Sequence, residues 1–403
     1  MRVAMVSEHA SPLAAIGGED AGGQNVHVAA LSKALVTAGH DVTVYTRRDS
    51  TTLPNRVMTS DGYVVEHVPA GPPTDIPKDQ LLKYMPELGR GLARRWNLDQ
   101  PDVVHSHFWM SGLATMRAVR AVQIPVVHTF HALGSVKRQH QGAKDTSPRS
   151  RIAQERMLCS SVDAVVATCT DEVAELTKLG LNPDRATVIP CGVDTDTFRP
   201  RPVRNSKQRR PFVLVVGRLV PRKGVEDVIR AMCHVRNADL VIAGGPDAEY
   251  LSADPEVKRL QAIARSVGVA GRVQFLGAVD RMVLPELMAR AELVVSAPWY
   301  EPFGIVPLEA MASGRAFVGT AVGGLLDSVV HGVTGDLVPA RRPDALGRVL
   351  NELLADPSRR ASYGSMGRAR AVSRYRWPRI GAETERVYAS VLARVSSETE
   401  VAR

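Results

Sequence analysis

Residues 296–314, SAPWYEPFGIVPLEAMASG, join a predicted strand to a predicted helix through a short loop. The apolar run Leu293–Ser296 predicts the strand, which Pro298 interrupts. A helix is expected over about 305–313, with Gly314 suited to the left-handed residue after its end. Because a helix start presents unpaired N–H groups and the positive end of a dipole, the stretch predicts an anion site, most often for phosphate.

Two carboxylates flank this junction, Glu301 in the loop and Glu309 on the helix. Carboxylates beside a bound phosphate need hydroxyl groups as hydrogen-bond partners and a nearby cation that offsets the repulsion. A ligand that is rich in hydroxyls and also bears phosphate suggests a sugar nucleotide. A helix cap with solvated acids is the alternative that this stretch alone leaves open.

Composition limits the class of protein. A chain of 403 residues is long enough for two domains, and 44% hydrophobic with 23% charged residues is typical of soluble globular proteins. No apolar run approaches the roughly 20 residues of a membrane span, and the four cysteines form no C-x-x-C pair, so we expect a cytoplasmic protein with free thiols. The charge of +9 permits acidic partners, but only 5% of residues are aromatic, which argues against a nucleic acid partner.

Strand and helix patterns alternate along the chain and restart after a basic, proline-containing segment. This alternation predicts two Rossmann-like α/β domains with parallel sheets, whose sites lie at the carboxyl ends of the strands. We expect an N-terminal domain over 1–198, a basic linker over 199–210, a second domain over 211–376 and a terminal helix over 377–403. Two such domains would face each other across a cleft, and the last helix is long enough to cross back to the first.

The glycine-rich loop 17–23 (GGEDAGG) precedes a predicted helix over 25–38. It lacks the G-x-G-x-x-G pattern and contains two acids that would repel a diphosphate, which argues against a dinucleotide-dependent dehydrogenase. Gly22 and Gly23 would let a ligand approach the backbone, although a tight turn is equally compatible. The helix is expected to bury one face made of Val26, Ala29, Ala30, Ala34 and Leu35.

In the second domain, segment 217–224 (GRLVPRKG) leaves a strand end and enters a helix. Arg218 and Lys223 therefore lie where two cations can grip a diphosphate and neutralise the charge that builds up as it departs. Solvated surface cations are the alternative.

Metal signals are weak. His105, His107, His128 and His131 end two predicted strands, but no cysteine or carboxylate partner is evident, so we expect polar lining and no metal. Residues 194–196 spell D-x-D at the linker, where a turn is the simpler explanation. With two cations available for the diphosphate, no metal or other cofactor is required.

Together these motifs resemble the donor site of the family 4 retaining glycosyltransferases, which have the GT-B fold. The likeness rests on segments 217–224, 301–304 (EPFG) and Glu309, and it extends over nearly the full chain. It implies that Arg218 and Lys223 bind the donor diphosphate, that Glu301 holds sugar hydroxyls and that Glu309 binds the ribose. It further implies donor contacts at Gly22, Gly23, Gly217, Phe303, Gly304 and Ile305, and a position beside the reacting carbon for His131.

The first half is similar to the inositol-phosphate N-acetylglucosaminyltransferases of mycothiol synthesis and, in part, to sucrose-phosphate synthases. The likeness lies in segments 7–13, 20–25, 105–109 and 128–137. It implies acceptor contacts at His9, Asp20, Asn25, Lys78, Phe108 and Arg151. Phe108 and Ala132 stand where the first group has a tyrosine and a threonine, so two hydroxyl donors, each worth about 1 kcal/mol, are missing.

The expected activity is transfer of a sugar from a nucleoside-diphosphate sugar, with UDP-sugars favoured, to a small polar acceptor with or without a phosphate. Retention of anomeric configuration is implied by the resemblance. A sugar-nucleotide epimerase of the same fold and a non-catalytic sugar-nucleotide-binding protein are the alternatives. The sequence leaves the oligomeric state open, a homodimer included.

Overall fold

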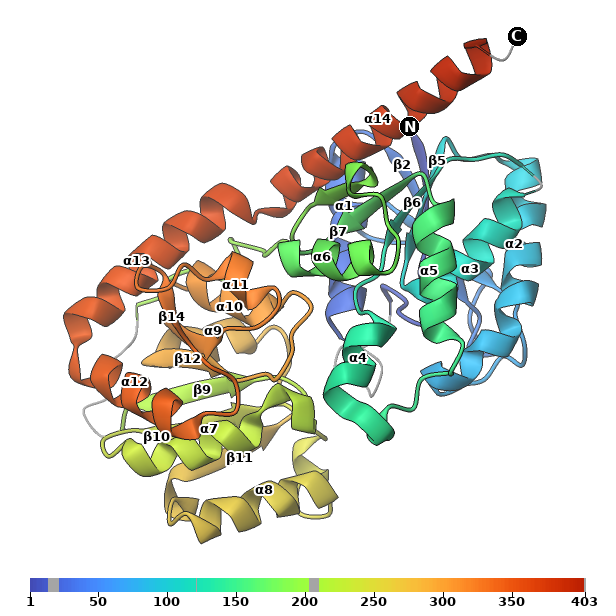
Figure 1. Ribbon diagram of the computed structural model, residues 1–403. Coiled ribbons are helices and arrows are strands. Elements are labelled where there is room, and N and C mark those ends of the chain that lie inside the picture. Colours follow the sequence, from blue (N-terminus) through green and yellow to red (C-terminus); the bar gives the residue numbers. More distant parts are fainter. Residues whose placement is uncertain (14–21, 121, 203–209, 402–403) are drawn as a thin grey trace. The chain divides into compact units, whose positions relative to one another are not determined.

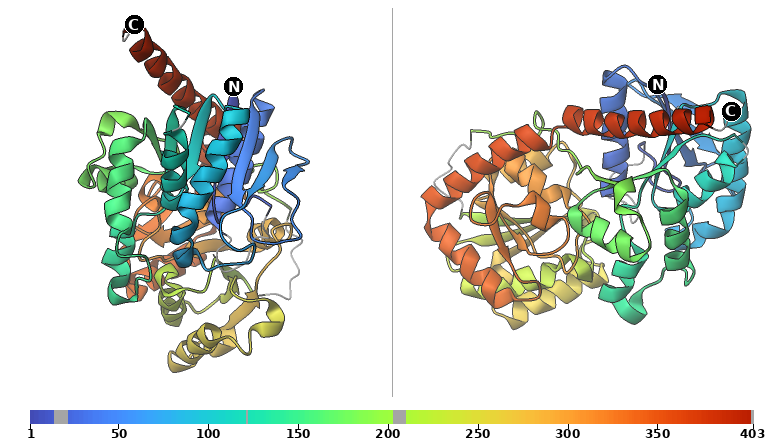
Figure 2. Two further views of the ribbon diagram at one scale, coloured as in Figure 1. Left: turned by 90° about the vertical axis from the view of Figure 1, so that its right-hand side faces the viewer. Right: turned by 45° about the horizontal axis from the view of Figure 1, so that its top comes forward.

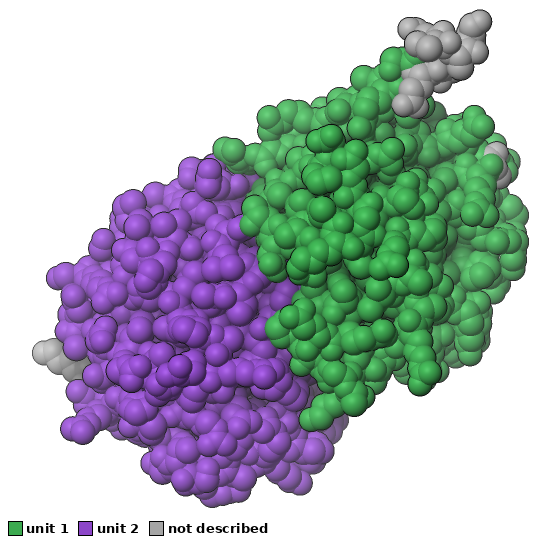
Figure 3. All heavy atoms as spheres, viewed as in Figure 1, with its two compact units in different colours: residues 1–191, 377–403 green, residues 192–376 purple. Residues whose placement is uncertain are grey.

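The computed structural model describes residues 1–13, 22–120, 122–202 and 210–401 (Figure 1). The chain divides into two compact units, which Figure 3 colours separately. Unit 1 comprises Met1–Cys191 together with Trp377–Arg403, and unit 2 comprises Gly192–Arg376. Each is an open α/β unit around a mostly parallel sheet, and the last helix belongs to unit 1, so the predicted fold class is confirmed.

Unit 1 contains an eight-stranded sheet of order β3-β4-β2-β1-β5-β6-β7-β8, in which only the β3–β4 pair is antiparallel. Its central strands are buried along their whole length, as expected for a parallel sheet covered on both faces. The strands are β1 (Arg2–Val6), β2 (Asp41–Arg47), β3 (Arg56–Met58), β4 (Val64–Val68), β5 (Val103–His107), β6 (Val126–Thr129), β7 (Ala164–Ala167) and β8 (Ala186–Val188).

Helices cover both faces of this sheet; α1 packs against α14, while α3 packs against α2 and α5 (Figures 1 and 2). The helices are α1 (Gly23–Thr37), α2 (Met85–Leu98), α3 (Trp109–Val119), α4 (Gly134–Gln141), α5 (Arg151–Ser161), α6 (Thr170–Lys178) and α14 (Trp377–Val401). None of the helices in the described ranges is long and apolar enough to cross a membrane.

The predicted buried face of α1 is wrong in part. Three of the five expected core residues are only half-buried, namely Val26, Ala29 and Ala30. His27, Val28 and Leu31 are buried in their place. The physical reason is that small apolar residues lie on every side of this helix, so its apolar pattern does not single out one face.

Unit 2 contains a six-stranded, fully parallel sheet of order β11-β10-β9-β12-β13-β14. Its strands are β9 (Phe212–Val216), β10 (Asp239–Ala243), β11 (Val273–Gly277), β12 (Leu293–Ser296), β13 (Ala316–Thr320) and β14 (Gly335–Val338). Its helices are α7 (Val225–Ala231), α8 (Pro255–Ser266), α9 (Leu284–Arg290), α10 (Ile305–Ala312), α11 (Leu325–Ser328), α12 (Pro343–Ala355) and α13 (Pro357–Arg374). Strands β9 and β12 are neighbours, which brings their carboxyl ends together.

The sequence patterns do not reveal β3 and β14. Strand β3 has three residues, none of them buried, on the edge of its sheet. Strand β14 begins with a glycine followed by Asp336, and both residues are poor strand formers. Packing against a neighbouring strand, and not local preference, determines both.

A buried hydrogen-bond network joins α14 to the sheet of unit 1. The Tyr388 hydroxyl lies 2.7 Å from His105 Nδ1, and His105 Nε2 lies 2.9 Å from Thr129 Oγ1. All three residues are fully buried. The network therefore ties the C-terminal helix to the end of β6.

We predict that Tyr388→Phe lowers the free energy of unfolding of unit 1 by about 1–3 kcal/mol, because it leaves a buried histidine nitrogen unpaired. Denaturant unfolding followed by circular dichroism measures the change. Tyr250→Phe, at an exposed tyrosine of unit 2, is the matched control and should have no effect. Equal stabilities of the two variants would contradict a structural role for the network.

Candidate active site

In unit 2, the loop after β9 is shaped by a glycine whose position leaves no room for a side chain. The loop forms a short 3-10 turn, Pro221–Lys223, and Gly224 then adopts a left-handed conformation with φ 64° at the start of α7. A Cβ atom on Gly224 would lie 1.8 Å from the carbonyl oxygen of Ala297, which follows β12. The close approach of these two loops therefore depends on a residue without a side chain.

Across this contact, Lys223 forms a short ion pair with Glu301. Burial, which alone would raise the pKa of Glu301, is outweighed by Lys223, Arg222 and Arg218, so the pKa of this carboxyl lies below its usual value. Glu301 is consequently ionised at neutral pH. Burial lowers the pKa of Lys223, and the attraction of Glu301 opposes that shift.

Trp299 anchors the loop that carries Glu301. Its backbone N–H donates to the carbonyl of Arg222 at 2.8 Å, and its indole Nε1–H donates to Asp227 at 3.1 Å. The guanidinium of Arg341 lies over the indole ring, 4.2 Å from its centroid. Trp299 therefore has a packing role that locks one loop to the other.

Helix α10 begins directly after Gly304, which has φ 84°. Glu309, on this helix, is buried, and Arg281 lies 3.1 Å from its Oε1 atom. Burial raises the pKa of Glu309, while Arg281 opposes that shift. An ionised carboxylate offers about four acceptor positions, so one arginine leaves capacity for a pair of hydroxyl groups.

In unit 1, three of the predicted acceptor residues gather around the ring of a fourth, Phe108. Lys78 Nζ and the Arg151 guanidinium lie 5.9 Å and 5.1 Å from the ring centroid, and the His9 ring meets it edge-on at 5.0 Å. Phe108 itself has φ 77° and ψ 149°, a conformation that bulky residues rarely adopt. Such backbone strain is typical of functional positions.

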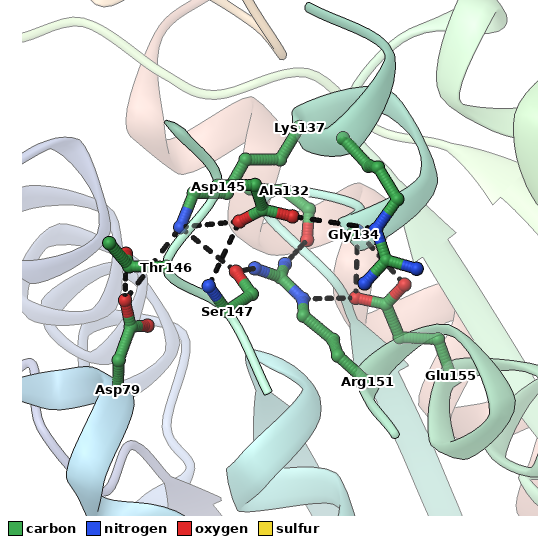
Figure 4. Close-up of polar contacts among 10 residues, drawn as sticks. Asp79, Ala132, Gly134, Lys137, Asp145, Thr146, Ser147, Arg151 and Glu155 are labelled. Atoms are coloured by element: carbon green, nitrogen blue, oxygen red, sulfur yellow. Dashed lines mark hydrogen bonds and ion pairs between the residues drawn. The ribbon is translucent and has the colours of Figure 1, made fainter. Parts of the chain in front are cut away.

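Arg151 is buried and held in one orientation (Figure 4). It donates to Glu155 at 2.7 Å, to the carbonyl of Ala132 at 2.7 Å and to Ser147 at 3.3 Å. Glu155 also accepts from the backbone of Gly134. At position 132 the guanidinium thus meets a backbone carbonyl and not a hydroxyl side chain.

A second cation lies in the same network, because Lys137 contacts Ser147 at 2.9 Å and Asp145 at 3.1 Å. Burial would raise the pKa of Asp145, but hydrogen bonds from Ser147 and Lys137 keep it below the usual value. Asp79 lies 3.8 Å from the same ammonium group. The region is therefore an alternating arrangement of cations and carboxylates.

The two remaining residues predicted to contact the acceptor are Asn25 and Asp20. Asn25 accepts a hydrogen bond from the backbone of Gly22 and donates to the carbonyl of Ser11. These bonds order the start of α1, whose first residue is Gly23. Asp20 lies outside the described residues.

A cluster of histidines lies at the ends of β5 and β6. His107 Nδ1 is 3.0 Å from His131 Nε2, and His131 has φ 60°. Burial lowers the pKa values of both residues well below the usual range, and their histidine neighbours add to the shift. The imidazoles are therefore neutral at pH 7.

Two of the four predicted histidines have partners outside this cluster. His105 belongs to the network that reaches α14, and His128 Nδ1 lies 2.7 Å from the hydroxyl of Ser106. The third member that meets His107 and His131 is His27 on α1. Burial lowers the pKa of His27 to about 4.

At the D-x-D segment, Asp194 accepts hydrogen bonds from Asp196 and Thr197 in a turn, as predicted.

Sequence reasoning missed Glu155, Asp227, Arg341 and His27. For Glu155 a signal exists, because Arg151 and Glu155 stand four apart on a helix and such pairs interact. Asp227 and Arg341 meet Trp299 from segments distant in sequence, so no local signal marks them. His27 lies within the apolar text of α1, where its neighbours do not distinguish it.

In unit 2 the lysine–glutamate pair lies in the loops after the adjacent strands β9 and β12, and the buried carboxylate of Glu309 lies on the helix that follows. Charged groups at the carboxyl ends of an open parallel sheet are typical of ligand-binding α/β enzymes. The model of Glycosyltransferase Family 4 matches residues 21–197, and that of Glycosyl transferases group 1 matches residues 196–370. The D-inositol 3-phosphate glycosyltransferase of Xylanimonas cellulosilytica is 36% identical, with 98% of this chain and 97% of the relative covered. The chain therefore belongs to this glycosyltransferase family and is a glycosyltransferase, as predicted.

Solved structures agree with this assignment. The chain is similar to sucrose-phosphate synthase from Thermosynechococcus elongatus, with 30% identity, a TM-score of 0.89, and 97% of this chain and 99% of that chain covered. HepE from Anabaena, in complex with UDP and glucose, has a TM-score of 0.77 at 22% identity, with 97% of this chain and 100% of that chain covered. The comparison with HepE shows only that the two proteins share a fold.

We predict that Gly224→Ala destabilises unit 2 more than Gly268→Ala does. Both glycines have positive φ values, 64° and 74°, but only Gly224 would place its new methyl group against another backbone. Gly268→Ala should therefore cost about 1 kcal/mol of backbone strain, and Gly224→Ala at least twice that. Denaturant unfolding of both variants checks the order, and equal losses would contradict it.

Proposed function

We propose that the protein transfers a sugar from a UDP-sugar to a small, phosphorylated polar acceptor, with retention of anomeric configuration and without a metal ion. The observation that carries the proposal is the Lys223–Glu301 ion pair at the ends of the neighbouring strands β9 and β12. It offers a cation for a diphosphate beside a carboxylate for sugar hydroxyls. Glu309, buried on α10, is the acceptor of the ribose hydroxyls in this proposal.

In the proposed reaction, the bond between the anomeric carbon and the diphosphate oxygen breaks while the acceptor oxygen attacks from the same face. The departing phosphate takes the proton of the acceptor hydroxyl, so no protein base is needed. Arg218, Lys223 and the N-terminus of α10 stabilise the negative charge on the leaving group. The same cations supply what a metal ion would otherwise supply.

His131 has a supporting role in this scheme. Its low pKa keeps the imidazole neutral at pH 7, so it serves as a hydrogen-bond partner of the donor sugar and not as an acid. Its position at φ 60°, directly after β6, gives the ring a defined direction. Retention itself is supported by the family resemblance.

The acceptor assignment rests on two cations and on the relatives. Arg151 is held in place by Glu155, and Lys78 lies on the ring of Phe108, so both are arranged before an acceptor arrives. A phosphate monoester fits such a pair. The curated relative of Xylanimonas cellulosilytica bears inositol 3-phosphate in its name, and the structural relative is a sucrose-phosphate synthase.

The proposed donor is a UDP-sugar, and the proposed compartment is the cytoplasm. The fold accommodates UDP and glucose in HepE, which makes UDP-sugars the first donors to test. All four cysteines are free thiols, which suits a reducing cytoplasm.

Coupled release of nucleoside diphosphate tests the proposal. UDP-glucose, UDP-galactose and UDP-N-acetylglucosamine are each incubated with polyols and sugars, in phosphorylated and unphosphorylated form. We expect UDP release only when a phosphorylated acceptor is present, an equatorial anomeric proton in the product by NMR, as in the α-linked donor, and no loss of rate in EDTA. Release of UDP without an acceptor would refute transfer to the acceptor. An inverted product would refute retention, and inactivation by EDTA would refute independence of a metal ion.

We predict that Lys223→Ala lowers kcat by more than about tenfold, because it removes a charge that stabilises the leaving diphosphate. Lys258→Ala, at an exposed lysine on α8, is the control and should retain the native rate. Circular dichroism verifies that both variants are folded. A native turnover rate for folded Lys223→Ala would rule out the proposed leaving-group site.

We also predict that UDP binds more weakly as the pH falls. Because burial raises the pKa of Glu309, this carboxylate takes up a proton at a higher pH than an exposed one and then loses acceptor capacity for the ribose hydroxyls. Isothermal titration calorimetry between about pH 5 and pH 8 measures the effect. Glu309→Gln should bind weakly with a flatter profile, which also corrects for titration of the UDP phosphate. Identical profiles for the two proteins would contradict this role.

A further inference from the structure

Three histidines of unit 1 converge although they come from separate elements. His27 lies on α1, His107 ends β5 and His131 follows β6. One nitrogen from each lies within 4.8 Å of the others, and no carboxylate belongs to the group. His27 and His107 are buried, whereas His131 is only half-buried and gives the group a side open toward solvent.

Two nitrogens of this group lack the hydrogen bonds that a buried polar atom normally makes. Within the described residues, His27 Nε2 and His107 Nε2 are buried and have no hydrogen-bond partner. Leaving such atoms unpaired is costly, because each has given up its hydrogen bonds with water without gaining a partner. Two unpaired nitrogens on imidazole rings that already converge with a third are better explained by a ligand than by packing.

Cys191 determines which nitrogen of His27 is available. His27 Nδ1 lies 3.2 Å from Cys191 Sγ, and in the tautomer whose Nδ1–H donates to the sulfur, Nε2 carries the free lone pair. Metal-binding histidines commonly use their second nitrogen in this way, because the hydrogen bond fixes the ring and its tautomer. His105 nearby differs, since both of its nitrogens have partners.

We propose that His27, His107 and His131 bind a divalent transition-metal ion of the zinc class, and that the bound ion inhibits sugar transfer. Neutral imidazoles suit Zn²⁺, Co²⁺ and Ni²⁺, whereas Mg²⁺ and Ca²⁺ require oxygen ligands. Ligands around tetrahedral zinc stand roughly 3.4 Å apart, so a modest rotation of the half-buried His131 closes the site. The fourth position remains open to water.

The ion is an inhibitor in this proposal and not a cofactor. Metal binding draws His131 away from its hydrogen bond with the donor sugar, so turnover stops while the ion is bound. The inhibition rests on the proposed function, but the binding does not. A binding measurement therefore tests the metal site alone, and a turnover measurement tests its inhibitory role.

Binding is tested on tag-free, full-length protein. Co²⁺ absorption in the visible range reports a nitrogen-bound tetrahedral ion, and calorimetry with Zn²⁺ gives stoichiometry and affinity. We expect one ion per chain, and at least a tenfold loss of affinity in His27→Gln. His234→Gln, at an exposed histidine of unit 2, is the matched control and should bind like the native protein.

Turnover is tested on the same proteins with and without Zn²⁺. Because His27 contacts no substrate in the proposed reaction, His27→Gln should keep its metal-free rate within about twofold and become insensitive to Zn²⁺ concentrations that inhibit the native enzyme. Inhibition of all variants alike would show that zinc acts on the donor phosphates, and this result would overturn the inhibitory role.

The metal site itself is refuted by the absence of a Co²⁺ spectrum or by equal Zn²⁺ affinity in native protein and His27→Gln. Circular dichroism establishes that the variant is folded. If His27→Gln does not fold, His107→Gln replaces it in the binding measurement, with the same expected loss. A native affinity in folded His107→Gln would refute the site equally.

Discussion

The ion pair between Lys223 and Glu301 joins two loops whose residues stand 78 positions apart in the chain. It exists because β9 and β12 are adjacent parallel strands, so that both loops leave the same edge of the sheet. Two further features hold these loops together: the missing side chain at Gly224 and the hydrogen bonds of Trp299. A buried cation and carboxylate would each be costly alone, and their pairing makes it possible to keep both charges ready in one place.

Unit 1 also holds its cations through ion pairs. Its cations are held by carboxylates of the same unit, Arg151 by Glu155 and Lys137 by Asp145. Such pairs restrict the side chains to one geometry, which reduces the entropy lost when an anionic ligand binds. The strained backbone of Phe108 fits this picture, because its ring is the surface on which Lys78 and Arg151 meet. The glycosyltransferase thus has preformed cationic positions in each unit.

The fold could be predicted from the sequence because parallel strands buried on both faces are continuous apolar runs, and the limits of β7, β9, β12 and β13 agree with them. The pair of Lys223 and Glu301 could also be anticipated, since both residues follow strand ends. The supporting contacts around this pair could not be predicted, because Asp227 and Arg341, which contact Trp299, and Arg281, which pairs with Glu309, come from segments whose local sequence gives no sign of a contact. The role of His27 could not be predicted for a further reason. A helix with small apolar residues on every side does not indicate which of its faces is buried.

The neutral histidines of unit 1 connect the proposed reaction with the proposed metal site. Burial lowers the pKa values of His27, His107 and His131, so each ring keeps an uncharged lone pair at pH 7. An acid–base mechanism would require an imidazole that titrates near neutrality. A reaction in which the leaving phosphate takes the proton does not, and it benefits from a dry, uncharged surface beside the sugar. The same lone pairs are the ligands that zinc prefers. In this proposal, sensitivity to transition metals follows from the placement of neutral imidazoles beside the transferred sugar.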